Sequence, residues 1–210
     1  MKLDDEKLGK LVSFFVRHGE TEGNAKGLFR GALDYPLSDK GQQDANHLKD
    51  FFSNIELGHA YSSDTTRART TAETILEPKG MVASETSDLR AWNTGYLSGL
   101  KKSEHQKDVD FFQHNENTDI PNGESLAKFR KRVQPRIKNS ILKGMESGVP
   151  SITIAHSSII HELSHMIHGD HNQVKVKPGG VVGVYHHGNK LSTKALVNES
   201  GKHQDKGFGG

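Results

Sequence analysis

The chain has 210 residues, no cysteine and a formal net charge of +2 at pH 7. This length suits a single α/β domain, and the lack of cysteine excludes disulfides, thiolate metal sites and cysteine nucleophiles. The nearly balanced charge argues against a dedicated nucleic-acid-binding protein. The polar first ten residues do not resemble a signal peptide, and no apolar run reaches the length of a membrane span. We therefore expect a cytoplasmic protein with neither nucleic acid nor membrane as a partner.

The first quarter of the chain has the pattern of a β-α-β unit. An apolar strand over residues 14–16 ends abruptly in Arg17-His18-Gly19, and residues 22–35 form a loop with three glycines. Ser38 is a predicted N-cap of a helix whose apolar stripe runs to Ile55. A short strand over residues 59–62 follows this helix.

A second helix is expected to run to Leu76, where a proline and a glycine follow. Arg67 falls in its first turns, where a cation opposes the helix dipole unless an anion lies nearby. Residues 81–86 are a predicted strand at the edge of the sheet. Residues 88–119 are polar and predict a long loop over one face, of a length that is often functional.

In the second half, Ser125 precedes a helix with apolar positions up to Ile141. The strand over residues 151–156 ends in His156, and a helix follows over residues 157–168. The closing strands are predicted at residues 174–176, 181–185 and 191–196. The predicted architecture is a single domain over residues 1–197, an α/β/α sandwich of three layers around a mostly parallel central sheet. Residues 198–210 are glycine-rich and polar, and we expect a disordered tail.

Four side chains share the carboxyl edge of this predicted sheet. Arg17 and His18 follow the first strand, Arg67 begins a helix after the second, and His156 ends a later strand. Ligands of open α/β sheets bind at that edge, and two guanidinium groups with two imidazoles suit a tetrahedral anion. The sequence therefore predicts a phosphate pocket.

The chain resembles the histidine phosphatase superfamily, which has the phosphoglycerate-mutase-like fold, over about residues 11–195. Phe15-Val16-Arg17-His18-Gly19-Glu20-Thr21 is similar to the signature of that family, and further matches follow in the same order. These are Asn24, Phe29-Arg30-Gly31, Pro36-Leu37-Ser38 with Gly41, Ser62-Ser63-Asp64, Arg67-Ala68, Thr71-Ala72, Gly123-Glu124-Ser125 and Ile154-Ala155-His156.

The resemblance implies a role for each site residue. His18 is the expected nucleophile, attacking phosphorus through Nε2 while a hydrogen bond at Nδ1 fixes the tautomer. Arg17, Arg67 and His156 are expected to hold the phosphoryl oxygens. Arg30 and Asn24 are expected to contact a small phosphorylated substrate, although loop capping explains Asn24 equally well. Water then cleaves the phosphohistidine, and neither a metal nor a cofactor is expected. The sequence gives no indication of the oligomeric state.

The chain departs from the family where a general acid usually stands, because Ala91 occupies that position and has no proton to donate. One interpretation is a substitute donor, with Glu124 and Asp88 as candidates and Glu104 behind them. A second is a preference for activated phosphate esters or phosphoramidates, and a third is a module that binds phosphorylated ligands with little turnover. Since a mutase needs the acid, we expect a phosphatase. Specificity is expected in residues 22–35 and 88–119, where Lys102 and its neighbouring lysines suit an anionic substrate or are simply solvated.

A competing motif belongs to another class of enzyme. His161-Glu162-Leu163-Ser164-His165 matches the H-E-x-x-H pattern of zinc proteases, with His171 at the spacing of a third ligand. A helical projection places these polar residues on the solvent side of a helix that packs on the sheet. The protease alternative also leaves Arg17, His18 and Arg67 without a role, so we expect a solvated helix face here.

Overall fold

The computed structural model describes residues 4–199 and 202–203. The strands of this part are β1 (Lys10–Arg17), β2 (Ala60–Ser63), β3 (Ser84–Thr86), β4 (Ser151–Ala155), β5 (Val181–His187), β6 (Lys190–Glu199) and β7 (Lys202–His203). Together these described strands form one seven-stranded sheet in the order β3-β2-β4-β1-β5-β6-β7. The strands from β3 to β1 pair in parallel, whereas β5, β6 and β7 add antiparallel pairs.

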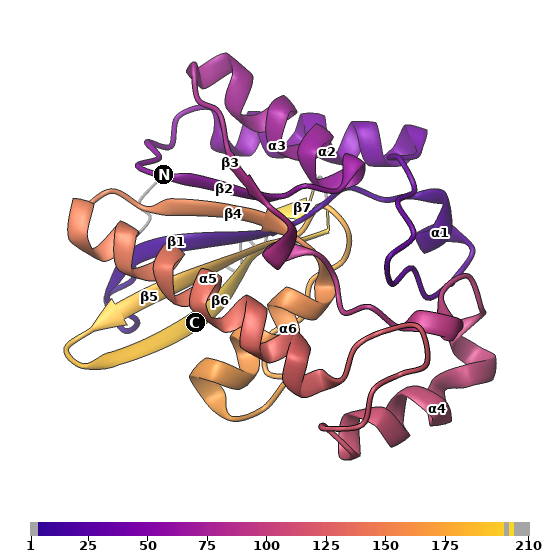
Figure 1. The fold of residues 1–210 in the computed structure, drawn as a ribbon. Helices are drawn as coiled ribbons and strands as arrows, with labels where there is room; N and C mark the ends of the chain where they lie inside the picture. Colours follow the sequence, from indigo (N-terminus) through magenta and orange to yellow (C-terminus); the bar gives the residue numbers. More distant parts are fainter. Residues whose placement is uncertain (1–3, 200–201, 204–210) are drawn as a thin grey trace, which may run out of the picture.

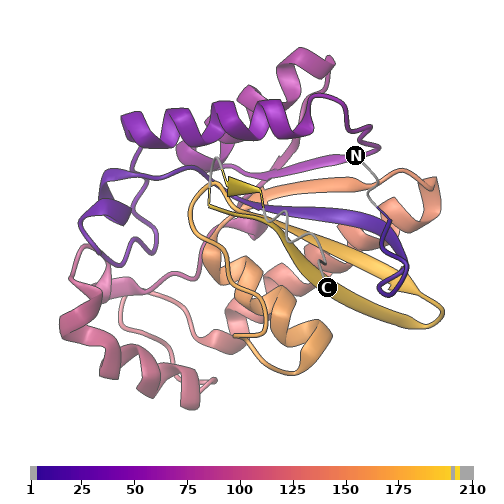
Figure 2. The same ribbon diagram turned by 180° about the vertical axis from the view of Figure 1, so that it is seen from behind.

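The described part has six α-helices, some of which cover the two faces of this sheet. They are α1 (Glu22–Ala25), α2 (Asp39–Phe52), α3 (Thr66–Leu76), α4 (Lys102–His114), α5 (Leu126–Ser147) and α6 (Ser157–His168). Figure 1 shows α2 and α3 on one face and α5 and α6 on the other, and the reverse view in Figure 2 agrees. The predicted α/β/α sandwich is therefore confirmed. None of the helices in the described part combines the length and hydropathy that a membrane span needs.

The first strand is apolar on both sides because both of its faces are covered. Phe14 and Val16 belong to the core beneath α2 and α3, whereas Phe15 belongs to the core beneath α5 and α6. All three side chains are almost fully buried. Parallel strands buried on both faces have such continuous apolar runs. The run ends at Arg17 because β1 leaves the sheet there.

Two of the predicted helix starts are confirmed. The hydroxyl of Ser38 accepts a hydrogen bond from the backbone N–H of Gly41 at the start of α2, and Ser125 does the same for Lys128 in α5. Each of these hydrogen bonds satisfies one backbone N–H group that has no partner within its own helix. Thr65 precedes α3 without making such a bond.

Three predictions about the remaining segments need correction. Residues 88–119 are not a loop throughout, because α4 lies within them and buries only Val109 and Phe112, too weak a stripe to detect from sequence. Residues 174–176 form no strand, since they lie in the connection between α6 and β5. The predicted tail begins inside β6, which extends to Glu199, and residues 202–203 form β7. The rest of that tail lies outside the described residues.

Candidate active site

The site forms where three neighbouring parallel strands end. In the order β2-β4-β1, Arg17 is in register with Ala155, and Ser62 with Ile154. His18, His156 and Ser63 therefore meet at one edge of the sheet, as the sequence predicted for the two histidines. The ring centroids of His18 and His156 are 5.2 Å apart.

His18 is fully buried, and its ring has one defined tautomer. Its Nδ1 lies 2.6 Å from the carbonyl oxygen of Gly19. A carbonyl can only accept, so Nδ1 carries the proton and donates it, and Nε2 keeps a lone pair. Burial lowers the pKa of His18 well below its ordinary value, and the charges of Arg30, His156, Arg67 and Arg17 lower it further. His18 is thus a neutral imidazole with a free nitrogen, because Nε2 is buried and has no hydrogen-bond partner among the described residues.

Close backbone packing holds the turn that carries His18. A Cβ atom at Gly19 would lie 2.4 Å from the carbonyl oxygen of Gly41, and one at Gly41 would lie 2.0 Å from that of Glu20. Neither position can accept a side chain without moving the backbone. The N-terminus of α2 therefore packs directly against the turn after β1. This contact fixes the carbonyl group of Gly19, which orients the ring of His18.

His156 forms its hydrogen bond through Nε2, whereas His18 forms its hydrogen bond through Nδ1. Nε2 of His156 lies 2.9 Å from the hydroxyl of Ser63. The hydroxyl also accepts from the backbone N–H of Thr65 at 3.5 Å and lies 3.3 Å from the Thr65 hydroxyl. Its own proton suits the shorter contact to His156, which leaves the ring proton on Nδ1. Burial lowers the pKa of His156 well below its ordinary value, followed by the charges of Arg67 and Arg30.

Arg17, Arg30 and Arg67 act on both imidazoles, and Lys102 lies close enough to Arg17 and Arg30 for their charges to affect it. Burial lowers the pKa of Arg17 to about 10, and burial with the charges of Arg17 and Arg67 lowers that of Arg30 to about 9. Burial, with Arg30 and Arg17, lowers the pKa of Lys102 to about 8. Burial also lowers the pKa of Arg67, although the carboxylate of Asp34 opposes that shift. Such a cluster of cations favours a bound anion.

The unpartnered atoms show what kind of anion fits. Five buried polar atoms of this site lack a hydrogen bond within the described residues: Arg17 Nε, Arg30 Nη1, Arg67 Nε, His156 Nδ1 and His18 Nε2. Buried polar atoms without a partner are rare, so a group of them marks a ligand site. Four can donate to oxygen atoms, and the fifth offers a lone pair to an electrophilic centre. That set suits a phosphoryl group.

Comparison with known proteins agrees with this chemistry. The family model of the histidine phosphatase superfamily (branch 1) matches residues 13–198. The chain belongs to the histidine phosphatase superfamily. It is 34% identical over 167 residues to a 2,3-bisphosphoglycerate-dependent phosphoglycerate mutase of Allorhizobium ampelinum, covering 74% of this chain and 77% of the relative. It is 31% identical to phosphoglycerate mutase-like protein 4 of Arabidopsis thaliana, covering 77% of this chain and 73% of that protein.

Solved structures show the same fold. A phosphoglycerate mutase from Thermus thermophilus aligns with a TM-score of 0.68 at 26% identity, covering 88% of this chain and 98% of the other. A mycobacterial glucosyl-3-phosphoglycerate phosphatase aligns with a TM-score of 0.72 at 23% identity, covering 91% of this chain and all of the other. The second likeness concerns the fold alone. This fold is therefore shared by a mutase and a phosphatase.

The structure leaves the acid position of the superfamily without an obvious substitute. Glu124 accepts two hydrogen bonds from Arg132, at 3.0 and 2.5 Å, and one from the backbone N–H of Asn93 at 2.9 Å. Asp88 accepts two from Arg136, at 2.9 and 2.7 Å. Both carboxylates are thus already engaged as acceptors of guanidinium groups. The third candidate, Glu104, is exposed and pairs with Lys101 at 3.3 Å.

The side-chain oxygen of Asn24 is hydrogen-bonded within the chain. This oxygen, Oδ1, accepts hydrogen bonds from the backbone N–H of Thr21 at 3.1 Å and from the Thr21 hydroxyl at 2.9 Å. The two residues form a capping box at the start of α1. The capping interpretation of Asn24 is therefore what the structure shows, and its contact with substrate stays a prediction.

The H-E-x-x-H match does not form a metal site. Glu162 is 1% exposed and accepts from Nε of Arg130 at 3.2 Å, while His165 and His171 stack with centroids 4.2 Å apart. Within the described residues, no group of three or more His, Cys, Asp or Glu could hold a metal ion. The predicted solvent exposure of Glu162 is wrong, because α6 packs on α5 as well as on the sheet.

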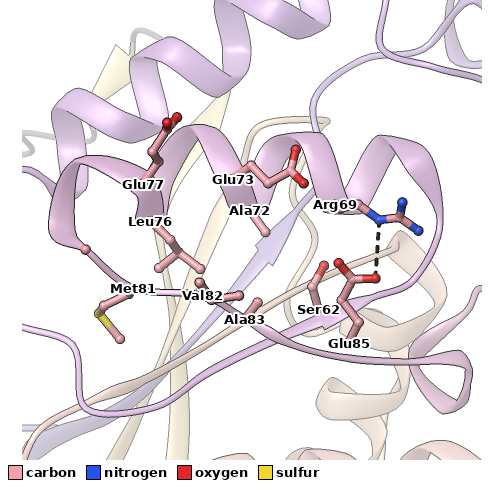
Figure 3. A pocket seen from close by; sticks show the side chains of 11 residues that line it. Ser62, Arg69, Ala72, Glu73, Leu76, Glu77, Met81, Val82, Ala83 and Glu85 are labelled. Carbon is pink, nitrogen blue, oxygen red and sulfur yellow. Dashed lines mark ion pairs between the residues drawn. The ribbon is translucent and has the colours of Figure 1, made fainter.

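A groove of about 610 Å³ on α3 is chemically unlike the active site. Figure 3 shows it between α3 and residues 81–85, with Ala72 and Leu76 on its apolar side. Its cation, Arg69, is paired with Glu85 at 3.2 Å, and the carboxylate of Glu73 adds negative charge. This groove would repel a phosphate dianion.

Proposed function

We propose that the protein is a phosphatase that hydrolyses phosphomonoesters or phosphoramidates of small molecules through a phosphohistidine on His18. The observation that carries this proposal is the hydrogen bond from Nδ1 of His18 to the carbonyl of Gly19, at 2.6 Å. It leaves the Nε2 lone pair free, as a nucleophile requires. The lowered pKa of His18 keeps that lone pair unprotonated at neutral pH.

In the first step, Nε2 of His18 attacks phosphorus while the bond from phosphorus to the leaving group breaks. The leaving atom departs with the electron pair of that bond. Negative charge stays on the phosphoryl oxygens, where the guanidinium groups and the proton on Nδ1 of His156 would stabilise it. The residues proposed for this task are Arg17, Arg30, Arg67 and His156. In the second step, water attacks phosphorus and loses a proton to solvent, the bond to nitrogen breaks, and its electron pair returns to Nε2.

Ala91 restricts the leaving groups that this site can expel. An alkoxide leaves poorly without protonation, whereas aryl oxide, acyl or imidazole groups need less help. Ala91 lines a cavity of about 250 Å³ together with Thr65, Asn93 and Asp34. The carboxylate of Asp34 already accepts hydrogen bonds from Thr66 and Arg67, so we propose that the leaving group departs here without a proton donor. We therefore propose activated phosphate esters and phosphoramidates as the preferred substrates.

Phosphoglycerate mutase activity is the second candidate, because the relative of Allorhizobium is named a phosphoglycerate mutase and that of Arabidopsis a phosphoglycerate mutase-like protein. A mutase must hold its phosphoryl group and return it to an alkyl hydroxyl, which requires the proton transfer that Ala91 cannot provide. Incubation with phosphoglycerates and a bisphosphoglycerate primer tests this alternative. Interconversion faster than release of inorganic phosphate would replace the phosphatase proposal.

An aryl phosphate assay tests the proposed reaction. Wild type should release phosphate and form an acid-labile phosphoenzyme, whereas His18→Ala should do neither. His47→Ala is the matched control, since His47 lies exposed on α2 and its loss should leave turnover unchanged. Activity that survives His18→Ala contradicts the nucleophile assignment. Tight binding of inorganic phosphate without turnover of aryl or alkyl esters would instead support a module that binds phosphorylated ligands.

A further inference from the structure

Helix α3 begins with a cation in its first turn and without a capping side chain of its own. Thr65, the residue before the helix, makes no capping hydrogen bond, and Arg67 is the second helical residue. Both features are unfavourable at the positive end of a helix dipole. An acceptor or an anion from elsewhere in the chain must therefore compensate.

Asp34 provides both, from the loop between α1 and α2. Its Oδ2 accepts hydrogen bonds from the backbone N–H and the hydroxyl of Thr66, each at 2.9 Å. Its Oδ1 accepts from Nη1 of Arg67 at 3.2 Å, and the same Nη1 donates to the carbonyl of Leu33 at 2.9 Å. One carboxylate thus caps the helix and holds the guanidinium group.

These contacts occupy one side of the Arg67 guanidinium only. Nη1 has two acceptors from the loop, while Nε is buried without a partner within the described residues. The Arg67 side chain is 1% exposed, so it has no room to reorient toward solvent. The side of the guanidinium that is left free is the side available to a phosphoryl oxygen. Arg30, four residues before Asp34, also has a buried unpartnered nitrogen, Nη1.

We propose that Asp34 is a positioning residue that locks Arg67, and the loop carrying Arg30, into the geometry required by the transition state. The proposal rests on the proposed phosphatase function. Guanidinium groups contribute to catalysis when they are fixed before charge develops, and small displacements are costly. Asp34 would act through Arg67 without touching the substrate.

A role as proton donor is the competing explanation, because Asp34 lines the cavity that also contains Ala91. The hydrogen bonds argue against it. Three donors point at the carboxylate, one of them a guanidinium group, so both oxygens are acceptors. The two roles predict different dependence on the leaving group, which makes them separable by experiment.

Asp34→Asn tests the proposal directly. The amide oxygen can still accept from Thr66, but the amide group cannot replace the anion beside Arg67. We expect kcat to fall about tenfold or more, by the same factor for an aryl and an alkyl phosphate, because the chemistry at phosphorus is affected. A loss confined to alkyl phosphate would identify Asp34 as a proton donor and overturn the positioning role. Unchanged kcat on both substrates would also overturn it.

Thr66→Ala is the matched control. It removes the hydroxyl contact to Oδ2 and leaves the pair between Asp34 and Arg67 intact. We expect lower resistance to urea with nearly normal kcat, which separates the capping contact from the positioning contact. If Thr66→Ala lowers kcat as much as Asp34→Asn, the effect belongs to the helix start and the proposal fails.

A double-mutant cycle and a transition-state mimic complete the test. In an Arg67→Ala background, Asp34→Asn should cause no further loss of kcat, whereas additive losses would show that Asp34 acts independently. Inhibition by vanadate should weaken more than inhibition by inorganic phosphate in Asp34→Asn, because positioning matters most in the transition state. If wild type neither turns over aryl phosphate nor binds phosphate, the proposed function fails. Active wild type with an unaffected Asp34→Asn rejects this inference alone.

Discussion

Lowering the pH from 7 to about 5.5 should destabilise the fold through the two histidines of the site. His18 and His156 are 0% and 1% exposed, and burial lowers both pKa values well below 6.5. In the unfolded chain these rings titrate near their ordinary value. Between the two pKa values the unfolded state binds protons that the native state does not, so stability rises with pH in this window.

The expected magnitude follows from the size of that window. Each ring contributes about 1.4 kcal/mol per pH unit below 6.5, which amounts to about 1.3 kcal/mol per ring between pH 7 and about 5.5. The two rings together lower the free energy of unfolding by about 2.5 kcal/mol, a large share of the total of about 5–15 kcal/mol typical of a domain. Asp64 and Asp119 have lowered pKa values, so their contribution is lost only at more acidic pH.

Urea unfolding in phosphate-free buffer at the two pH values measures this difference. His156→Gln removes one titrating ring, so its loss of stability on acidification should be about 1.3 kcal/mol smaller than that of wild type. The contributions of His18 and of His161, whose pKa burial lowers to about 4, remain in this variant. His47→Gln removes an exposed histidine and should keep the wild-type difference. Equal free energies of unfolding for wild type at both pH values would mean that the two rings titrate normally, and would refute the buried neutral site.

Three further predictions concern catalysis. Ser63→Ala removes the hydrogen bond that fixes the tautomer of His156, so kcat for an aryl phosphate should fall about tenfold; an unchanged kcat contradicts this role. Ala91→Glu places a carboxyl group in the leaving-group cavity, so the ratio of alkyl to aryl kcat/KM should rise by about tenfold to a hundredfold; an unchanged ratio means that the acid was not limiting. Lys102 loses its proton as the pH rises through its pKa of about 8, so kcat/KM should decline there in wild type, and Lys102→Met should abolish that decline.

Local chemistry made part of the site predictable. The abrupt end of the apolar run at Arg17 placed His18 at a strand terminus, and the same pattern at residues 151–156 placed His156. The position of Arg67 against the helix dipole also indicated that an anion lay nearby. The structure shows that anion to be Asp34, which no local pattern could identify because 33 residues separate it from Arg67.

Other features depend on contacts between distant segments. Glu124 and Asp88 are candidate acids by composition, but Arg132 and Arg136 on α5 hold both carboxylates as acceptors. Glu162 lies on the polar side of its helix in projection, yet α5 covers it. Helices with few apolar residues, such as α4, could not be predicted from the spacing of apolar residues.

The sequence by itself determined the strands that end at Arg17 and His156, the nucleophile candidate and the unusual Ala91, because these follow from residue type and spacing along the chain. Only the tertiary structure decided which nitrogen of each histidine is free, which cations lack partners, and which carboxylates are already bound. Protonation and hydrogen bonding depend on burial and on neighbours from other segments. The contacts of Gly19 and Gly41 and the surrounding arginines show that Nδ1 of His18 is hydrogen-bonded and that the ring is neutral, which supports the proposal of Nε2 as the nucleophile.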